Sequence, residues 1–136
     1  MKTLLYWLPT VFWMSLIFFL SSRASVKVSD TQVVQFLFFK TLHVVEYAIL
    51  YVLLFRSLKN TYPAPLWQNR YNALLIAVTY GMTDEVHQMF VPTREGAFRD
   101  VIIDTMGISL AAISLWKLLP PAPKPLKALA KKLAIL

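Results

Sequence analysis

The hydrophobic residues of this chain are gathered into four long runs rather than spread over the short patches of a globular core. The runs cover residues 4–20, 42–58, about 71–90 and 101–119. Each run has the length of a membrane-spanning helix, which takes roughly 17–25 predominantly apolar residues. The pattern therefore predicts an all-α polytopic membrane protein, built as a bundle of four transmembrane helices.

The segments between the runs indicate where the helices begin and end. The apolar stretch "VVQFLFF" (residues 33–39) precedes the second run, so the second helix either starts earlier or follows an interfacial segment. The sequence "NTYPAPLWQNR" between the second and third runs carries two prolines and predicts a loop. We expect residues 1–119 to form one membrane domain.

Residues 120–136 form a separate tail. The sequence "PPAPKP" does not continue a helix and predicts a short stiff spacer. Beyond it, apolar residues share one helical face and lysines share another: Leu126, Leu129, Ala130 and Leu133 against Lys127, Lys131 and Lys132. This pattern predicts a cationic amphipathic helix on an anionic inner leaflet. A basic terminus that only fixes topology is the alternative, and both interpretations stay open.

The composition agrees with a membrane protein and excludes several kinds of site. Hydrophobic residues make up 57% of the chain and charged residues only 15%. Cysteine is absent, which excludes disulfides, thiolate nucleophiles and cysteine-based metal sites. The net charge is +7, but the basic residues flank apolar runs instead of alternating with exposed aromatics. Membrane topology explains this charge, and no nucleic-acid partner is expected.

The charges also predict an orientation in the cytoplasmic membrane. If both termini are cytoplasmic, nine basic residues lie on the inner side and five on the outer side. The positive-inside rule favours this arrangement. All seven acidic residues then fall on the outer side. We predict an integral inner or plasma membrane protein with N-in, C-in topology.

In this orientation polar residues of all four helices gather at one level near the outer surface. The second helix opens with "KTLHVVEY", the third closes with "TDEVHQ" and the fourth opens with "RDVIID". The predicted catalytic residues are Asp84, Glu85, His87, His43 and Glu46. The predicted substrate-binding residues are Lys40, Tyr47, Gln88, Arg94, Arg99, Asp100, Asp104 and Ser22.

The depth of the third helix makes its carboxylates informative. Asp84 lies thirteen residues after Tyr71, about 20 Å along a helix, whereas the hydrocarbon core is roughly 30 Å thick. A carboxylate at such a depth costs at least about 2.5–3.5 kcal/mol. We therefore expect Asp84 and Glu85 to face the bundle interior and to meet a cation there.

The spacing of these residues fits three kinds of chemistry. His43 with Glu46, and Asp84 with His87, are i,i+3 pairs that share a helix face. Two such pairs facing each other suit a divalent metal, one carboxylate suits a general acid or base, and ion pairs alone suit a structural role. The spacing leaves all three open, and we assign no metal ligand and no cofactor. Gly107 is expected to mark a close helix contact.

The polar segments resemble the motifs of the VanZ-like family of small membrane proteins. The matching stretches are "KTLHVVEYAILYVLL" and "TDEVHQMFVPTREGAFRDVIIDTMG", and the resemblance covers about residues 15–115. The sequence departs from the family pattern at Thr83, Thr93 and Asp104, where Ser, Gly and Asn are usual. The third departure adds a carboxylate.

The resemblance implies a role at the cell envelope, because the family is named for a protein associated with resistance to the glycopeptide teicoplanin. Our leading hypothesis is an outer-leaflet site that binds or processes a polar lipid head group or a lipid-linked cell-wall precursor. Arginine and lysine would hold phosphate or carboxylate there. The alternatives are a non-enzymatic membrane module with a structural polar cluster, or a metal- or proton-linked membrane protein. The sequence does not determine whether a bond is broken, nor the oligomeric state.

Overall fold

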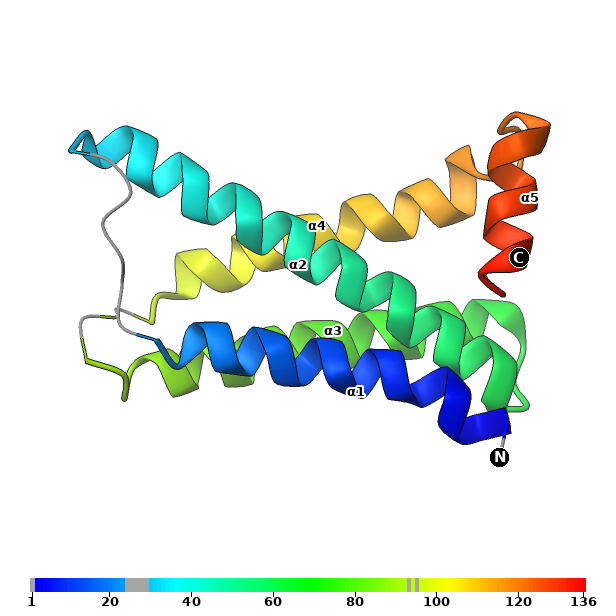
Figure 1. Ribbon diagram of the computed structural model, residues 1–136, viewed down its shortest axis with the longest axis horizontal. Coiled ribbons are helices and arrows are strands. Elements are labelled where there is room, and N and C mark those ends of the chain that lie inside the picture. Colours follow the sequence, from blue (N-terminus) through cyan, green and yellow to red (C-terminus); the bar gives the residue numbers. More distant parts are fainter. Residues whose placement is uncertain (1, 24–29, 93, 95) are drawn as a thin grey trace.

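The computed structural model describes residues 2–23, 30–92, 94 and 96–136. Helices joined by short connections make up this part of the chain, and no strand occurs within it (Figure 1). The elements are α1 (Lys2–Ser21), α2 (Gln32–Thr61), α3 (Leu66–Gln88), α4 (Phe98–Ile113), a π-helical turn (Ser114–Leu118) and α5 (Lys124–Lys132). Thr93, together with Lys27 and Glu95, which were counted among the charges of the predicted outer side, lies outside the described ranges.

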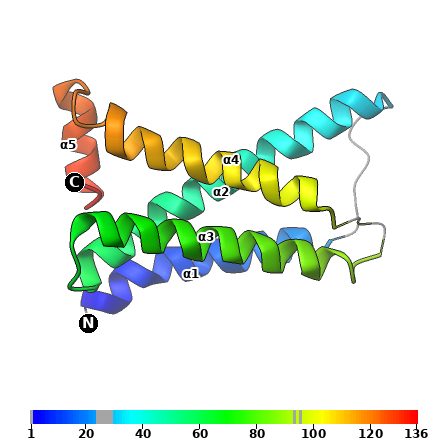
Figure 2. The same ribbon diagram turned by 180° about the vertical axis from the view of Figure 1, so that it is seen from behind.

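Helices α1 to α4 run back and forth along the long axis of the molecule (Figures 1 and 2). Both chain termini and the α2–α3 connection lie at one end, which we call the terminal end. At the other end, the site end, α1 and α3 finish while α2 and α4 begin. Helix α5 lies across the terminal end instead of continuing along the bundle axis (Figure 1).

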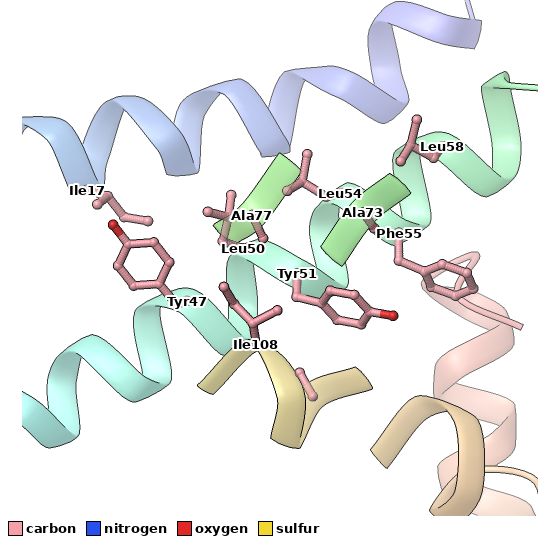
Figure 3. Close-up of a cluster of buried hydrophobic side chains, with 11 residues drawn as sticks. Ile17, Tyr47, Leu50, Tyr51, Leu54, Phe55, Leu58, Ala73, Ala77 and Ile108 are labelled. Carbon is pink, nitrogen blue, oxygen red and sulfur yellow. The ribbon is translucent and has the colours of Figure 1, made fainter. Parts of the chain in front are cut away.

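Helix α2 is the centre of the bundle. It has 30 residues and starts at Gln32, so the earlier of the two expected starts is confirmed. It contacts α1, α3 and α4, and its largest interface is with α4. Its side chains make up most of the hydrophobic core shown in Figure 3, where fully buried Tyr47, Leu50 and Leu54 meet Ile17 of α1 and Ile108 of α4.

Small residues let the neighbouring helices approach α2 closely. Ala73, Ala77 and Gly81 recur every four residues on the buried face of α3, a spacing that brings two helix backbones together. On α4 a Cβ added to Gly107 would collide with the backbone of Val44. The expected close contact at Gly107 is therefore confirmed, and its partner is α2.

The outer surface of the bundle is apolar on every long helix, with large hydrophobic side chains facing outward. By length and apolarity, three helices of the described residues suffice to cross a membrane: Thr3–Ser21, Gln32–Thr61 and Phe98–Leu118. The prediction of four apolar spans is thus supported for three only. Helix α3 falls short because it is polar near both ends, yet Asn69, Asp84 and Gln88 are buried within the bundle.

The tail folds back onto the terminal end. Helix α5 begins at Lys124 with Pro125 in its first turn, where a missing N–H costs nothing. The helix therefore starts inside the predicted "PPAPKP" spacer. Beyond α5, polar side chains of α2 donate to the last carbonyls: Arg56 Nε to Leu133 at 2.7 Å, Asn60 Nδ2 to Ala134 at 2.9 Å and Lys59 Nζ to Ile135 at 3.2 Å.

We predict that Gly107→Ala lowers the melting temperature of the purified protein in detergent. The added methyl group meets the Val44 backbone, and overpacking of this kind costs about 1–3 kcal/mol. The matched control is Met106→Ala, because Met106 precedes Gly107 and is 56% exposed. Equal melting temperatures for the two variants would show that the α2–α4 contact tolerates a side chain.

Candidate functional site

Polar side chains of α2 and α4 meet where these two helices cross near the site end. Lys40 of α2 forms an ion pair with Asp100 of α4. One turn further along both helices, His43 Nδ1 lies 3.2 Å from Asp104 Oδ1. Next comes the contact of Val44 with Gly107. The two helices thus run in the same direction through this crossing, and residues further along α2 meet residues further along α4.

Helix α3 contributes two carboxylates to the site, opposite the contacts between α2 and α4. Asp84 Oδ2 accepts hydrogen bonds from Ser21 Oγ of α1 at 2.8 Å and from Gln88 Nε2 at 2.9 Å. Glu85 Oε2 accepts the backbone N–H of Ala97 at 3.0 Å. Both carboxylates are nearly inaccessible to solvent, with Asp84 3% and Glu85 4% exposed. As expected, they face the bundle interior, but neither forms an ion pair with a lysine or arginine of the described residues, so the expected cation partner is not found.

The connection after α3 folds back over the end of that helix. A Cβ on Gly96 would collide with the carbonyl of Glu85 and the side chain of Met89. Only glycine allows the chain to pass so close, and the next residue is then placed to give Glu85 the N–H of Ala97. The glycine in "REGAF" therefore helps to hold a buried carboxylate.

Arg94 ties the same connection to α1. Its Nε donates to the carbonyl of Arg23 at 2.9 Å and its Nη2 to the carbonyl of Leu20 at 3.2 Å. The last carbonyls of a helix have no partners within the helix and carry partial negative charge. A guanidinium suits this position both as a donor and as a cation.

A pocket of about 220 Å³ opens between α1, α2 and Arg94. Its apolar wall is formed by Leu20, Phe39 and Leu42. Its polar wall carries side chains of both signs, namely Ser21, Arg23, His43, Glu46 and Arg94. The pocket therefore offers an apolar and a charged surface to the same ligand.

Three buried polar atoms behind this pocket have no hydrogen-bond partner among the described residues. They are the Tyr47 hydroxyl, Asp84 Oδ1 and Asp104 Oδ2. Tyr47 is fully buried, and both Asp84 and Asp104 lie close to its hydroxyl. Buried polar atoms are normally paired, because each unpaired one costs about 1–3 kcal/mol. These three atoms mark the interior of the site as polar.

Some predicted site residues lie apart from this centre. The ring of His87 stacks on Phe18 of α1 with centroids 4.3 Å apart. The two expected His–carboxylate pairs therefore do not face each other, although Asp84 and His87 do share the face toward α1. Arg99 is 66% exposed, lies 3.5 Å from Asp100 and covers the ring of Phe36. It does not line the pocket.

Ser22 is also outside the centre, since it is exposed and donates to the carbonyl of Phe18. The serine that reaches Asp84 is Ser21, which was not among the predicted site residues. The pair "SS" gave no signal for choosing between the two, because only the orientation of the helix end decides which one points inward. Tyr80 was missed as well, and its hydroxyl donates to the carbonyl of Met14 at 2.6 Å.

Residues 6–119 match the model of the protein family described as VanZ/LLP1. The chain belongs to the VanZ/LLP1 family. The comparison with curated proteins found no match, and neither did the comparison with solved structures.

In this VanZ/LLP1 protein three polar sequence segments meet in space. The segment "KTLHVVEY" supplies Lys40 and His43, "TDEVHQ" supplies Glu85, and "RDVIID" supplies Asp100 and Asp104. Atoms of His43, Glu85 and Asp104 lie within 4.8 Å of one another. The three segments were expected to form the walls of one polar pocket; they do meet, but of the three only "KTLHVVEY" lines the pocket of about 220 Å³.

We predict that Lys40→Met lowers the free energy of unfolding by about 3–5 kcal/mol, the usual cost of leaving one partner of a buried ion pair alone. The side chain of Asp100 is only 7% exposed and that of Lys40 18%. Unfolding in mixed micelles with increasing denaturing detergent measures the change.

The control is Arg99→Met, which removes a 66% exposed cation from the same carboxylate and is expected to cost less than about 1 kcal/mol. The double variant Lys40→Met/Asp100→Leu should recover most of the loss, because the charge left alone is gone. If both single variants lose the same amount, burial does not distinguish the two cations.

Proposed function

We propose that this VanZ/LLP1 protein spans the cytoplasmic membrane with four helices and directs its site end outward. Three helices are long and apolar enough to cross a membrane. Helix α3 is the proposed fourth span, because its 23 residues extend about 34 Å and most of its polar side chains near the site end are buried in the bundle. The excess of basic residues toward the terminal end supports cytoplasmic termini.

In the same proposal α5 lies on the inner surface of the membrane. It crosses the terminal end of the bundle (Figure 1), and it carries Lys124, Lys127, Lys131 and Lys132. Leu126, Leu129 and Leu133 are about half exposed, which leaves an apolar face for lipid. A helix with basic and apolar faces suits an anionic leaflet.

Single cysteines test the orientation without interference, because the chain has none of its own. We expect Met89→Cys, at the site end, to react with a membrane-impermeant maleimide in intact cells. Pro63→Cys, in the α2–α3 connection, should react only after permeabilisation. The reverse pattern would overturn the orientation.

We propose that the site end binds the phosphate-bearing head group of a lipid. The observation that carries this proposal is the pocket of about 220 Å³ with its apolar wall beside Arg94, His43 and Glu46. A lipid presents an apolar chain and a polar head side by side, and this pocket presents the complementary surfaces. The bidentate geometry of a guanidinium suits phosphate oxygens.

The acidic side chain narrows the class of head group. Glu46 accepts hydrogen bonds and repels phosphate, so its presence beside Arg94 favours a head group that also carries donors, such as sugar hydroxyls or an amine. Lipid-linked cell-wall precursors combine a phosphate with such donors. If the protein binds these precursors, it would alter susceptibility to glycopeptides such as teicoplanin, which act on the outer side of the membrane.

We predict that phosphatidylglycerol, which combines a phosphate with hydroxyl groups, raises the melting temperature of the wild-type protein in nanodiscs relative to phosphatidylcholine alone. Arg94→Gln should abolish most of this rise, because it removes the guanidinium from the pocket. The control Lys117→Gln removes one exposed positive charge at the terminal end and should keep the rise. If both variants lose the rise in melting temperature equally, the effect is a non-specific one of charge, and the proposed head-group site in the pocket is wrong.

The same experiment separates a binding site from a purely structural cluster. In Glu46→Gln protein with unchanged thermal stability, a binding site predicts altered lipid preference and loss of any teicoplanin protection seen with wild type at matched expression. A structural cluster predicts that stability and function fall together. Empty vector provides the baseline for susceptibility.

A further inference from the structure

The buried centre of the site end holds more negative than positive charge. Lys40 is paired with Asp100, and Arg94 donates to the backbone carbonyls of Leu20 and Arg23 at the end of α1. Within residues 2–23, 30–92, 94 and 96–136, no lysine or arginine forms an ion pair with Glu85 or Asp104. These two carboxylates, 4% and 1% exposed, share the single imidazole of His43. A buried charge is costly unless an opposite charge or a proton balances it.

The geometry of these three side chains suits a metal ion. They come from α2, α3 and α4, and each offers a ligand atom within 4.8 Å of the others. Ligands at about 2.0–2.2 Å from one ion in tetrahedral geometry lie about 3.3–3.6 Å apart. The separation of His43 Nδ1 from Asp104 Oδ1 is 3.2 Å, and a carboxylate oxygen of Glu85 lies within 4.8 Å of the ligand atoms of the other two side chains.

A second observation points independently to a ligand. Asp104 is 1% exposed, yet its Oδ2 has no hydrogen-bond partner among the described residues. This oxygen faces α3, 3.7 Å from the position of a Cβ built on Gly81, one turn before Glu85. An ion between the helices provides the partner that this oxygen lacks.

The pocket provides an entry path for an ion. His43 lines the pocket of about 220 Å³, and its side chain is 12% exposed, whereas Glu85 and Asp104 lie behind it. A metal site needs such a path as well as ligands. An ion entering from the pocket meets the imidazole first and the two carboxylates next.

We propose that His43, Glu85 and Asp104 bind one divalent transition-metal ion of the Zn²⁺ or Mn²⁺ type. A neutral imidazole and two carboxylates balance a charge of +2. Imidazole nitrogen favours Zn²⁺ over Mg²⁺ and Ca²⁺, which prefer oxygen ligands alone, and the two carboxylates also suit Mn²⁺. Three protein ligands leave a further coordination position open. This metal site is independent of the proposed lipid function, because the ion would bind to the lipid-free protein.

The test is metal binding by the full-length protein, purified in detergent, treated with EDTA and freed of the chelator. Isothermal titration with Zn²⁺, and electron paramagnetic resonance with Mn²⁺, should each give about one bound ion per chain for wild type. Asp104→Asn and His43→Gln should weaken binding of Zn²⁺ at least about tenfold, since each removes a ligand. A thousandfold excess of Mg²⁺ should not displace bound Zn²⁺ from wild type.

The control is Asp30→Asn, the same chemical change at an exposed aspartate before α2, which should bind as wild type does. Circular dichroism and a single gel-filtration peak establish that each variant is folded. If Asp104→Asn does not fold, Glu85→Gln takes its place.

Two outcomes would overturn the proposed metal site: no saturable binding to wild type, or binding that is unchanged in two folded ligand variants. Protons would then have to balance the carboxylates. Lipid is absent throughout, so failure here and failure of the lipid experiment are distinguishable.

Discussion

The close approach of α4 to α2 at Gly107 is the contact on which the site end depends. Because residue 107 has no side chain, α4 packs against the backbone of Val44. That contact fixes the register in which Asp104 meets His43 and Asp100 meets Lys40. A shift of one residue would rotate the carboxylates by about 100° around a helix with 3.6 residues per turn. Packing and electrostatics are therefore coupled at this crossing.

The α3–α4 connection completes the polar centre. Arg94 donates to the carbonyl of Leu20 in the last turn of α1 and to that of Arg23 just beyond it, and the backbone after Gly96 donates to Glu85. The same short stretch therefore closes one helix end and holds a carboxylate of another. A buried carboxylate that lacks a basic partner is stabilised by such N–H donors, since charge-assisted hydrogen bonds are stronger than neutral ones. This arrangement explains how a mostly apolar bundle accommodates acids at one end.

The two ends of α2 make different contacts. At the site end its Lys40 and His43 contact the carboxylates of α4. At the terminal end its Arg56, Lys59 and Asn60 bind carbonyls of the last residues of the chain. Between them, its buried aromatic and leucine side chains make up the core (Figure 3). One long helix thus links the outward-facing pocket of our proposal to the tail on the opposite side.

The sequence by itself determined the helices and the general place of the polar centre. Long apolar runs have no stable alternative to helices in a membrane, and charged residues next to such runs must gather where they balance one another. The predicted fourth apolar span is not supported for α3, because polar side chains lower the mean hydropathy of that helix even though several of them are buried in the bundle.

The tertiary structure alone decided which neighbours meet. Ser21 reaches Asp84 while Ser22 does not, and His87 stacks on Phe18 instead of joining His43. Helical periodicity fixes the angle between residues of one helix, but not the rotation of that helix about its own axis. Only packing against the other helices, through contacts such as Gly107 on Val44, sets that rotation.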